Sequence, residues 1–297
     1  MENQHLKEFV IYKGQKIFVE ETGGKFYLDL RCRNIEDITE IEGLAELEYL
    51  EIVYLDGNNI TEIKGLSSLV NLKELNLEGN QISEVKGLDK LQNLRRLMFG
   101  GNQISVIKGL EKLKNLEYLF FAIPTESFGN QIIDIKGLDY LKNLKFLNIS
   151  NNKISEIKGF GNLTNLETLY LHCNEIFKIQ NLDNLKNLKY LYLSNNNIEK
   201  IENLHGLTNL RVLDLSNNKI SEISGLENLS NLRSLVLDSN QIKNIKGLQN
   251  LPNLEYLFLR YNQISKLGKI EILKKLNSVR LDGNPILGEE LVKLGGK

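Results

Sequence analysis

The sequence is poor in the residues that mark several large classes of protein. Its 297 residues include no tryptophan, three prolines and two cysteines. Cys32 and Cys173 lie far apart, whereas a small secreted scaffold carries an even framework of several cysteines. We therefore expect two free thiols in a reducing compartment. This favours a cytoplasmic protein, with the nucleus as an alternative intracellular location.

Long apolar runs and an excess of one charge are also missing. No run approaches the length that spans a bilayer, and residues 1–24 lack a basic stretch followed by an apolar one. The sequence therefore predicts neither a membrane segment nor a signal peptide. The 37 basic and 38 acidic residues give a formal net charge of -1, which provides no general field for nucleic acid or an acidic membrane. With 41% hydrophobic residues, the chain is expected to fold and to be soluble.

The dominant feature of the sequence is a repeat of 22 residues, of which Asn71–Gln92 is one unit. Each unit fits the pattern L-x-x-L-x-L-x-x-N-x-I-x-x-I-x-G-L. An asparagine marks the register, with one spacing of 28 residues among the spacings of 22. A period held over eleven units predicts a solenoid of stacked turns. The marker residues are Asn58, Asn80, Asn102, Asn130, Asn152, Asn174, Asn196, Asn218, Asn240, Asn262 and Asn284.

The pattern also predicts which side chains are buried. Side chains alternate along a strand, so Leu75 and Leu77 point inward while Glu74 and Asn76 point outward. The marker asparagine follows the strand, where its amide can bond the backbone of its own turn and of the neighbouring turn. A glycine that recurs before a leucine, such as Gly87, permits a tight turn on the far side of the coil.

We therefore expect an α/β fold, namely a right-handed, horseshoe-shaped solenoid with a parallel sheet on its concave face. The unit is too short for a full helix, which predicts 3₁₀ turns or irregular chain on the convex face. Alternating apolar residues flank Lys13-Gly14 and predict a β-hairpin that caps the N-terminal end. Arg33 takes the asparagine place of a degenerate first turn, and Gly288 to Leu294 is expected to form a short helical turn. The predicted boundaries are a cap over 1–43, repeats over 44–287 and a C-terminal cap over 288–297.

These units resemble the 22-residue subclass of leucine-rich repeat proteins. That subclass includes the nuclear regulatory subunit of type-1 protein phosphatase, a flagellar dynein light chain and a spliceosomal leucine-rich protein. The resemblance covers about residues 44–287, and it implies protein binding on the concave sheet without catalytic residues. Bacterial internalins share the unit length, but the missing signal peptide and wall-anchoring tail place them second.

The outward positions of the predicted strands are rich in aromatic residues that the core does not need. Contiguous exposed apolar surface marks interaction sites, and Tyr, Phe and Met are enriched at interface centres. The alternative is that aromatic side chains suit strands and cover one another. The predicted partner-binding residues are Tyr54, Met98, Tyr118, Phe120, Phe146, Tyr170, His172, Tyr190, Tyr192, Val236, Tyr256, Phe258 and Arg260.

Acidic residues flank this aromatic region and predict a rim that orients a basic partner, with an ordinary soluble surface as the alternative. They are Asp56, Glu74, Glu78, Asp214, Asp238 and Asp282.

The 28-residue unit carries an insertion in which Ala122 to Gly129 replace the usual two residues. We expect a binding loop stiffened by Pro124 and tipped by Phe128, because function concentrates in such loops. A bland insertion at a surface turn is the alternative.

The sequence offers little for catalysis or metal binding. His172 and Cys173 are adjacent, so they point to opposite faces of a strand and form no catalytic or metal-binding pair. Lysines recur on the predicted convex face, as at Lys86, but acids such as Glu84 precede them by two residues and largely cancel their charge. We therefore predict a monomeric, non-catalytic protein-binding scaffold with no metal, cofactor, nucleic acid or membrane partner. The alternatives are a regulatory subunit of an enzyme such as a type-1-like phosphatase and, last, an enzyme.

Overall fold

The computed structural model describes residues 8–123, 129–268 and 276–292. The chain divides into two compact units, Met1–Asn148 and Ile149–Lys297, each of which is a solenoid of short parallel strands. The predicted loop residues Pro124 and Phe128 lie outside the described residues.

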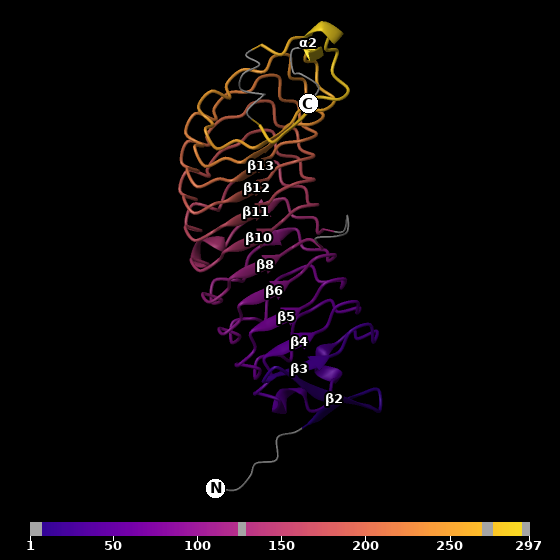
Figure 1. Cartoon of the computed structure of the whole chain (residues 1–297). Coiled ribbons are helices and arrows are strands. Elements are labelled where there is room, and N and C mark those ends of the chain that lie inside the picture. Colours follow the sequence, from indigo (N-terminus) through magenta and orange to yellow (C-terminus); the bar gives the residue numbers. More distant parts are fainter. Residues whose placement is uncertain (1–7, 124–128, 269–275, 293–297) are drawn as a thin grey trace. The chain divides into compact units, whose positions relative to one another are not determined.

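The first unit begins with an antiparallel hairpin and continues as a stack of parallel strands (Figure 1). The hairpin consists of β1 (Phe9–Tyr12) and β2 (Gln15–Thr22), followed by β3 (Lys25–Asp29). The repeat strands are β4 (Ile52–Tyr54), β5 (Glu74–Asn76), β6 (Arg96–Met98), β8 (Tyr118–Phe120) and β10 (Phe146–Asn148), paired in that order. The short strands β7 (Val106–Ile107) and β9 (Asp134–Ile135) pair apart from this stack. The 3₁₀ turns are η1 (Ile38–Glu40), η2 (Leu44–Glu46) and η3 (Leu138–Tyr140).

The second unit has the same architecture. Its parallel strands are β11 (Thr168–Tyr170), β12 (Tyr190–Tyr192), β13 (Val212–Asp214), β14 (Ser234–Val236), β15 (Tyr256–Phe258) and β16 (Ser278–Arg280). A short helix, α2 (Gly288–Val292), follows where the helical turn is predicted. The parallel-strand solenoid, the N-terminal hairpin and the scarcity of helix are confirmed, whereas the cap boundaries at residues 43 and 287 stay predictions.

The core consists of the leucines and isoleucines that the repeat pattern turns inward. Leu75 and Leu77 have no exposed surface, while Glu74 and Asn76 on the same strand are half-buried. Complete burial of one leucine contributes about 1.5–3 kcal/mol, so the stack is stabilised by many equal contributions between neighbouring turns. Phe99 and Phe121 depart from the leucine pattern, and their buried rings stack with centroids 5.6 Å apart.

The marker asparagines form a buried ladder between turns, as predicted. Asn80 donates from Nδ2 to the carbonyls of Leu55 and Leu77, both at 3.0 Å, and its Oδ1 accepts from the N–H of Ile60 at 3.0 Å. Arg33 occupies the asparagine position of the first turn. Its backbone N–H donates to Oδ1 of Asn58 at 3.0 Å. One side chain therefore satisfies polar backbone groups of two turns, which lets the irregular chain remain buried.

The predicted glycine turns are also present. Gly87 has a φ of 84°, and a Cβ atom there would lie 2.0 Å from the carbonyl oxygen of Ile63 in the preceding turn. Any side chain at this position would push adjacent turns apart, so glycine sets how closely they stack.

Candidate protein-binding surface

The strand face, defined here as the side of the repeat strands that points away from the core, holds the residues predicted to bind a partner. Most of these side chains are half-buried rather than bare, and Tyr256 and Arg260 are exposed. The half-buried residues are Tyr54, Met98, Tyr118, Phe146, Tyr170, His172, Tyr190, Tyr192, Val236 and Phe258. The strand face therefore has accessible aromatic surface in both units.

Phe120 is the exception among the predicted residues. The sequence predicts an exposed ring, but only 9% of Phe120 is exposed. Phe146 covers it from the next strand, with ring centroids 4.9 Å apart, and Phe146 also lies 6.3 Å from Tyr118. The prediction of an exposed Phe120 is wrong because these rings pack on one another, as the alternative interpretation holds for this part of the surface.

Arg96 completes this cluster, although the sequence reasoning assigned it no role. Its guanidinium carbon lies 4.8 Å from the ring centre of Tyr118 and 5.9 Å from that of Phe120, while its Nε lies 3.6 Å from Glu74 Oε2. The cation is thus held between an aromatic ring and a carboxylate. The repeat register could have revealed this cluster, since Glu74, Arg96 and Tyr118 occupy the same strand position in successive turns.

Tyr54 lies in a separate depression at the N-terminal end of the first unit. Its ring is 6.2 Å from that of Tyr27, and the Arg31 guanidinium is 5.3 Å from its centre. Arg31 pairs with Asp29 at 2.6 Å and lowers the pKa of that carboxyl by hydrogen bonding. The depression has a volume of about 510 Å³. Tyr54 therefore contacts Tyr27 and Arg31 of its own chain and is half-buried.

The strand face of the second unit carries a stacked pair of tyrosines. The rings of Tyr170 and Tyr192 are parallel within 6°, with centroids 4.4 Å apart. They meet because parallel pairing places Tyr170 directly opposite Tyr192. The His172 ring stands edge-on to Tyr170 at 5.8 Å, and Asp214 follows opposite Tyr192 on β13. We name Tyr170, His172, Tyr192 and Asp214 the tyrosine cluster.

Burial dominates the electrostatics of this cluster. It raises the pKa of Tyr192 to about 12, with further contributions from Tyr170 and Asp214. Burial also lowers the pKa of His172, and the Asp214 carboxylate opposes part of that effect. Burial therefore favours the neutral forms of Tyr192 and His172.

A second patch of the same unit contains Val236, Tyr256, Phe258 and Arg260. Val236 pairs opposite Phe258, and Tyr256 is 40% exposed. Arg260 binds Oδ2 of Asp238 through Nε at 2.8 Å and through Nη2 at 2.7 Å, and Asp238 is buried. The prediction that Asp238 belongs to an exposed acidic rim is therefore wrong, because its charge is neutralised within the chain.

The environment of Cys173 does not favour a reactive thiol. Cys173 has left-handed backbone with a φ of 54°, and burial raises the pKa of its thiol, which disfavours the nucleophilic thiolate. Across the described parts of the chain, no three His, Cys, Asp or Glu side chains gather in a way that could hold a metal ion. Within the same residues, no helix has the length and apolar character that a membrane crossing needs.

The charge compensation predicted for the lysines on the far side of the coil is confirmed where the structure shows their contacts. Lys64 pairs with Asp37 at 2.7 Å, and Lys86 lies 3.5 Å from Glu62. Exposed pairs of this kind contribute about 0–1 kcal/mol, so their main effect is to keep the surface electrically mixed.

Comparison with known proteins identifies the repeat. The family profile described as "Leucine Rich repeats (2 copies)" matches residues 50–90, 142–187, 186–228, 208–250 and 230–269, which together exceed half of the chain. The comparison with curated proteins found no match.

Among solved structures, an internalin of Listeria monocytogenes, InlF, is 32% identical and superposes with a TM-score of 0.81 over 91% of this chain and 77% of its own. A leucine-rich repeat protein of Leptospira interrogans is 29% identical, with a TM-score of 0.67 over 84% of this chain and 71% of its own. Internalin C2 of Listeria monocytogenes is 30% identical, with a TM-score of 0.53 over 69% of this chain and 77% of its own. The sequence analysis placed the internalins second because of the ends of the chain. The similarity in solved structures extends over the repeats, and it favours a resemblance to the internalins.

Proposed function

Because the chain belongs to the leucine-rich repeat family, we propose that it is a non-catalytic scaffold that binds a folded protein partner on its strand face. Folds of this family are typical of protein–protein interaction domains. The strands that carry this face are paired with their neighbours by backbone hydrogen bonds, so little of the backbone has to be ordered on binding.

The observation that carries this proposal is the stacked pair Tyr170 and Tyr192. Stacking covers one face of each ring but leaves both side chains half-buried rather than buried. Phe120 shows the contrasting case, in which self-packing leaves almost no accessible ring. Tyrosine combines a large apolar surface with a hydroxyl and is frequent among the residues that dominate binding energy.

The test is capture of a partner from the native cell by the full chain and by the double variant Tyr170→Ala/Tyr192→Ala. The control is Tyr140→Ala, which removes an exposed tyrosine from η3, away from the strand face. We expect the double variant to lose at least about tenfold in affinity, as a dominant interface residue would. Full capture by a double variant with an unchanged circular dichroism spectrum contradicts the proposal.

Regulation of an enzyme, such as a type-1-like protein phosphatase, is the second candidate. The observation that favours it is the carboxylate of Asp214 opposite Tyr192, since the sequence resemblance to the nuclear regulatory subunit of type-1 protein phosphatase implies a mixed aromatic and acidic binding surface. The captured partner is assayed for phosphatase activity with and without the purified chain. A partner whose turnover the chain does not alter counts against this candidate.

The cytoplasmic location and the monomeric state are part of the same proposal. The two free cysteines support the location, because free thiols persist in a reducing compartment. Cell fractionation tests the first statement and light scattering after size-exclusion chromatography tests the second. Recovery outside the cell, or a mass of two chains, contradicts the corresponding part.

A further inference from the structure

Asp214, in the tyrosine cluster, has one carboxylate oxygen that its own chain leaves open. Its Oδ1 accepts from the N–H of Ser216 at 2.9 Å and from the Ser216 hydroxyl at 2.7 Å. Within the described residues, Oδ2 has neither a hydrogen-bond nor an ion-pair partner, and it is not enclosed by the protein. Asp214 therefore offers one accessible carboxylate oxygen on the strand face.

The groups around Asp214 provide an aromatic wall without a cation. Tyr170 on β11 covers one face of the Tyr192 ring, so the opposite face is turned toward β13 and Asp214. Val236 pairs opposite Asp214 on the other side, and neither β12 nor β14 contains a lysine or arginine. Burial lowers the pKa of His172, which favours its neutral form. The site therefore combines an apolar ring face with an unpaired carboxylate oxygen.

The first unit contains the same pair of groups together with a cation. Asp29 pairs across the sheet with Tyr54, as Asp214 pairs with Tyr192. Arg31 binds the two oxygens of Asp29 through Nε at 3.0 Å and Nη2 at 2.6 Å. Its guanidinium carbon lies 5.3 Å from the ring centre of Tyr54. A guanidinium can therefore satisfy a carboxylate and a tyrosine ring at once when the two occupy adjacent strands.

Ser216 stands where Arg31 stands in the first unit. Each follows its aspartate by two residues, and its backbone N–H donates to Oδ1 of that aspartate, at 3.1 Å for Arg31 and 2.9 Å for Ser216. The tyrosine lies on the following strand at Asp29 and on the preceding strand at Asp214, but strands are spaced by about 4.8 Å in either direction. The turn is thus conserved between the two places, and the guanidinium is missing from the second.

Two other carboxylates of the strand face also have an arginine of this chain. Arg96 lies with its Nε 3.6 Å from Glu74 Oε2 and its guanidinium carbon 4.8 Å from the ring centre of Tyr118. Arg260 binds Asp238 at 2.7 and 2.8 Å. Arginine is therefore the cation that repeatedly accompanies carboxylates on this face.

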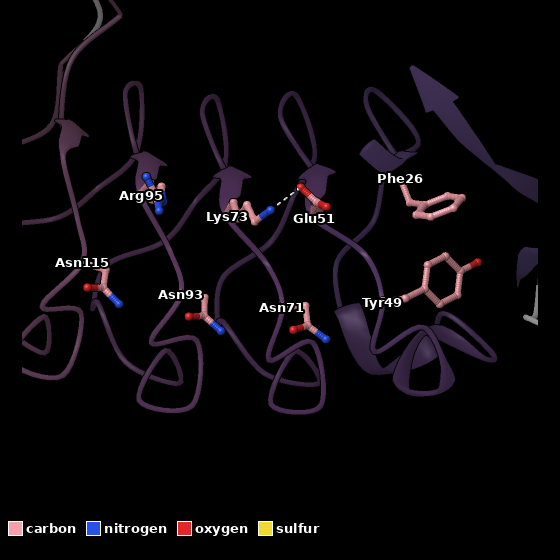
Figure 2. Close-up of a pocket in the computed structure, with 8 residues that line it drawn as sticks. All are labelled: Phe26, Tyr49, Glu51, Asn71, Lys73, Asn93, Arg95 and Asn115. Atoms are coloured by element: carbon pink, nitrogen blue, oxygen red, sulfur yellow. Dashed lines mark hydrogen bonds and ion pairs between the residues drawn. The ribbon is translucent and has the colours of Figure 1, made fainter. Parts of the chain in front are cut away.

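The depression on the flank of the first unit is the contrasting case (Figure 2). Lys73 points to Glu51 and pairs with it at 2.7 Å, and Arg95 pairs with Glu117 at 3.1 Å. Both cations that line this depression already have a carboxylate of the chain, so a charged ligand would have to compete with these pairs. A cation at Asp214 Oδ2 would not.

We propose that the tyrosine cluster receives an arginine side chain of the protein partner, which binds Asp214 Oδ2 and packs on the free face of Tyr192. A guanidinium donates hydrogen bonds in its plane and stacks with its face, so it can use both groups together. An ammonium is a strongly hydrated point charge and gains less from this arrangement. The inference rests on the proposed function, because it names what the partner contributes to the strand face.

The first test is titration of the purified full chain with three amino-acid derivatives, followed through the ring protons of His172 by NMR. The chain has three histidines, so His172→Gln assigns the signal, which reports on the tyrosine cluster. The probes are N-acetylarginine amide, N-acetylcitrulline amide, which has a similar shape without the charge, and N-acetyllysine amide. We expect a saturable shift with the arginine derivative and at least about fivefold weaker binding of the other two. No saturable shift with the arginine derivative overturns the proposal, and so does equal binding of either other probe.

Two variants of the full chain locate the binding site. Asp214→Asn keeps the shape of the side chain and removes its charge. Ser216→Arg supplies a guanidinium from within the chain, as Arg31 does in the first unit, and removes no wall of the site. Each is expected to weaken binding of the arginine derivative at least about tenfold. A folded form of either variant that binds like the wild type overturns the proposal.

Matched controls make the same chemical changes away from the strand face. Ser224→Arg introduces an arginine at the repeat position that Lys86 occupies in the first unit. Asp183→Asn removes a carboxylate that lies beside His205 at 3.2 Å. Both are expected to bind the arginine derivative as the wild type does. A loss in the controls equal to that in the variants contradicts a site at Asp214, since it would follow from net charge alone.

Partner capture separates this inference from the proposed function. If Tyr170→Ala/Tyr192→Ala retains the partner, the strand face is not the binding surface and both fail. If that double variant loses the partner while Asp214→Asn and Ser216→Arg capture it as the wild type does, only the inference fails. Loss of capture in all three, with capture retained by Ser224→Arg, supports both.

Discussion

Ile104 and Asn130 are joined by a hydrogen bond of 2.9 Å from the backbone N–H of Ile104 to Oδ1 of Asn130. The 28-residue unit separates their turns, yet the bond repeats the one between Ile82 and Asn102 in a 22-residue unit, also at 2.9 Å. Asn130 further donates to the carbonyls of Phe99 and Phe121, both at 2.8 Å. The asparagine ladder therefore keeps its register across the 28-residue unit.

The ladder predicts that replacing two different asparagines of the second unit by alanine changes the free energy of unfolding by different amounts. Asn240→Ala leaves the buried N–H of Ile220, now bonded at 3.0 Å, without its acceptor, whereas the carbonyl of Leu215 keeps Asn218 as a donor. We expect a loss of about 2 kcal/mol in the free energy of unfolding. Asn231→Ala removes one exposed bond, to Thr208, and is expected to cost less than about 1 kcal/mol. Urea denaturation measures both, and equal losses argue against the ladder as the stabilising element.

A side chain in place of Gly100 is predicted to clash with the backbone at the start of the insertion. A Cβ atom there would lie 2.7 Å from the backbone nitrogen of Ile123, which is too close for a side chain. Gly100→Ala is expected to destabilise the protein by about 1–3 kcal/mol through forced backbone movement. A Cβ atom at Gly161 meets only Asn184 Nδ2 at 3.9 Å, so Gly161→Ala is expected to be neutral or to stabilise by up to about 1 kcal/mol. Thermal unfolding compares the two variants, and similar midpoints contradict the close contact.

Tyr192 predicts a loss of stability in strong alkali. Its pKa is about 12 in the folded protein, chiefly because of burial, against a usual value of 10.0. The folded chain thus holds this proton more tightly than the unfolded chain does. The stabilisation is complete below pH 10 and disappears as the pH rises to 12. Absorbance titration of tyrosine ionisation should show a late component that Tyr192→Phe removes and Tyr140→Phe retains. A late component that persists without Tyr192 refutes the assignment.

The lowered pKa of His172 predicts that the stability of the protein falls in mild acid. Burial lowers its pKa below the usual value of 6.5, so the unfolded chain binds this proton more readily. Stability is therefore complete above pH 6.5 and declines as the pH falls below that value. We expect His172→Gln to lose less stability than the wild type between pH 7 and pH 5. His205→Gln is the control, since His205 is exposed and lies 3.2 Å from Asp183. If the wild type and His172→Gln show the same dependence of stability on pH, His172 is not the cause of the loss in mild acid.

The candidate site could be predicted from the sequence only in part. The register places Tyr170 beside Tyr192, because both have the same strand position in adjacent turns. It does not reveal that their rings stack or that Arg96 covers Tyr118, since these contacts depend on rotamers. The contact between Phe26 and Tyr49 was missed for a different reason. Phe26 comes from the first strand, which departs from the repeat, and so no pattern linked it to Tyr49.

The sequence by itself determined the solenoid, the inward leucines and the asparagine ladder. Alternation within a strand and the period between strands decide which side chains enter the core, and both are visible without coordinates. Only the tertiary structure decided how much of each outward side chain stays accessible. Phe120 and Tyr256 both point outward, yet 9% of one and 40% of the other is exposed. Exposure on this face depends on the size and rotamer of side chains one turn away, and in this chain those neighbours differ from turn to turn.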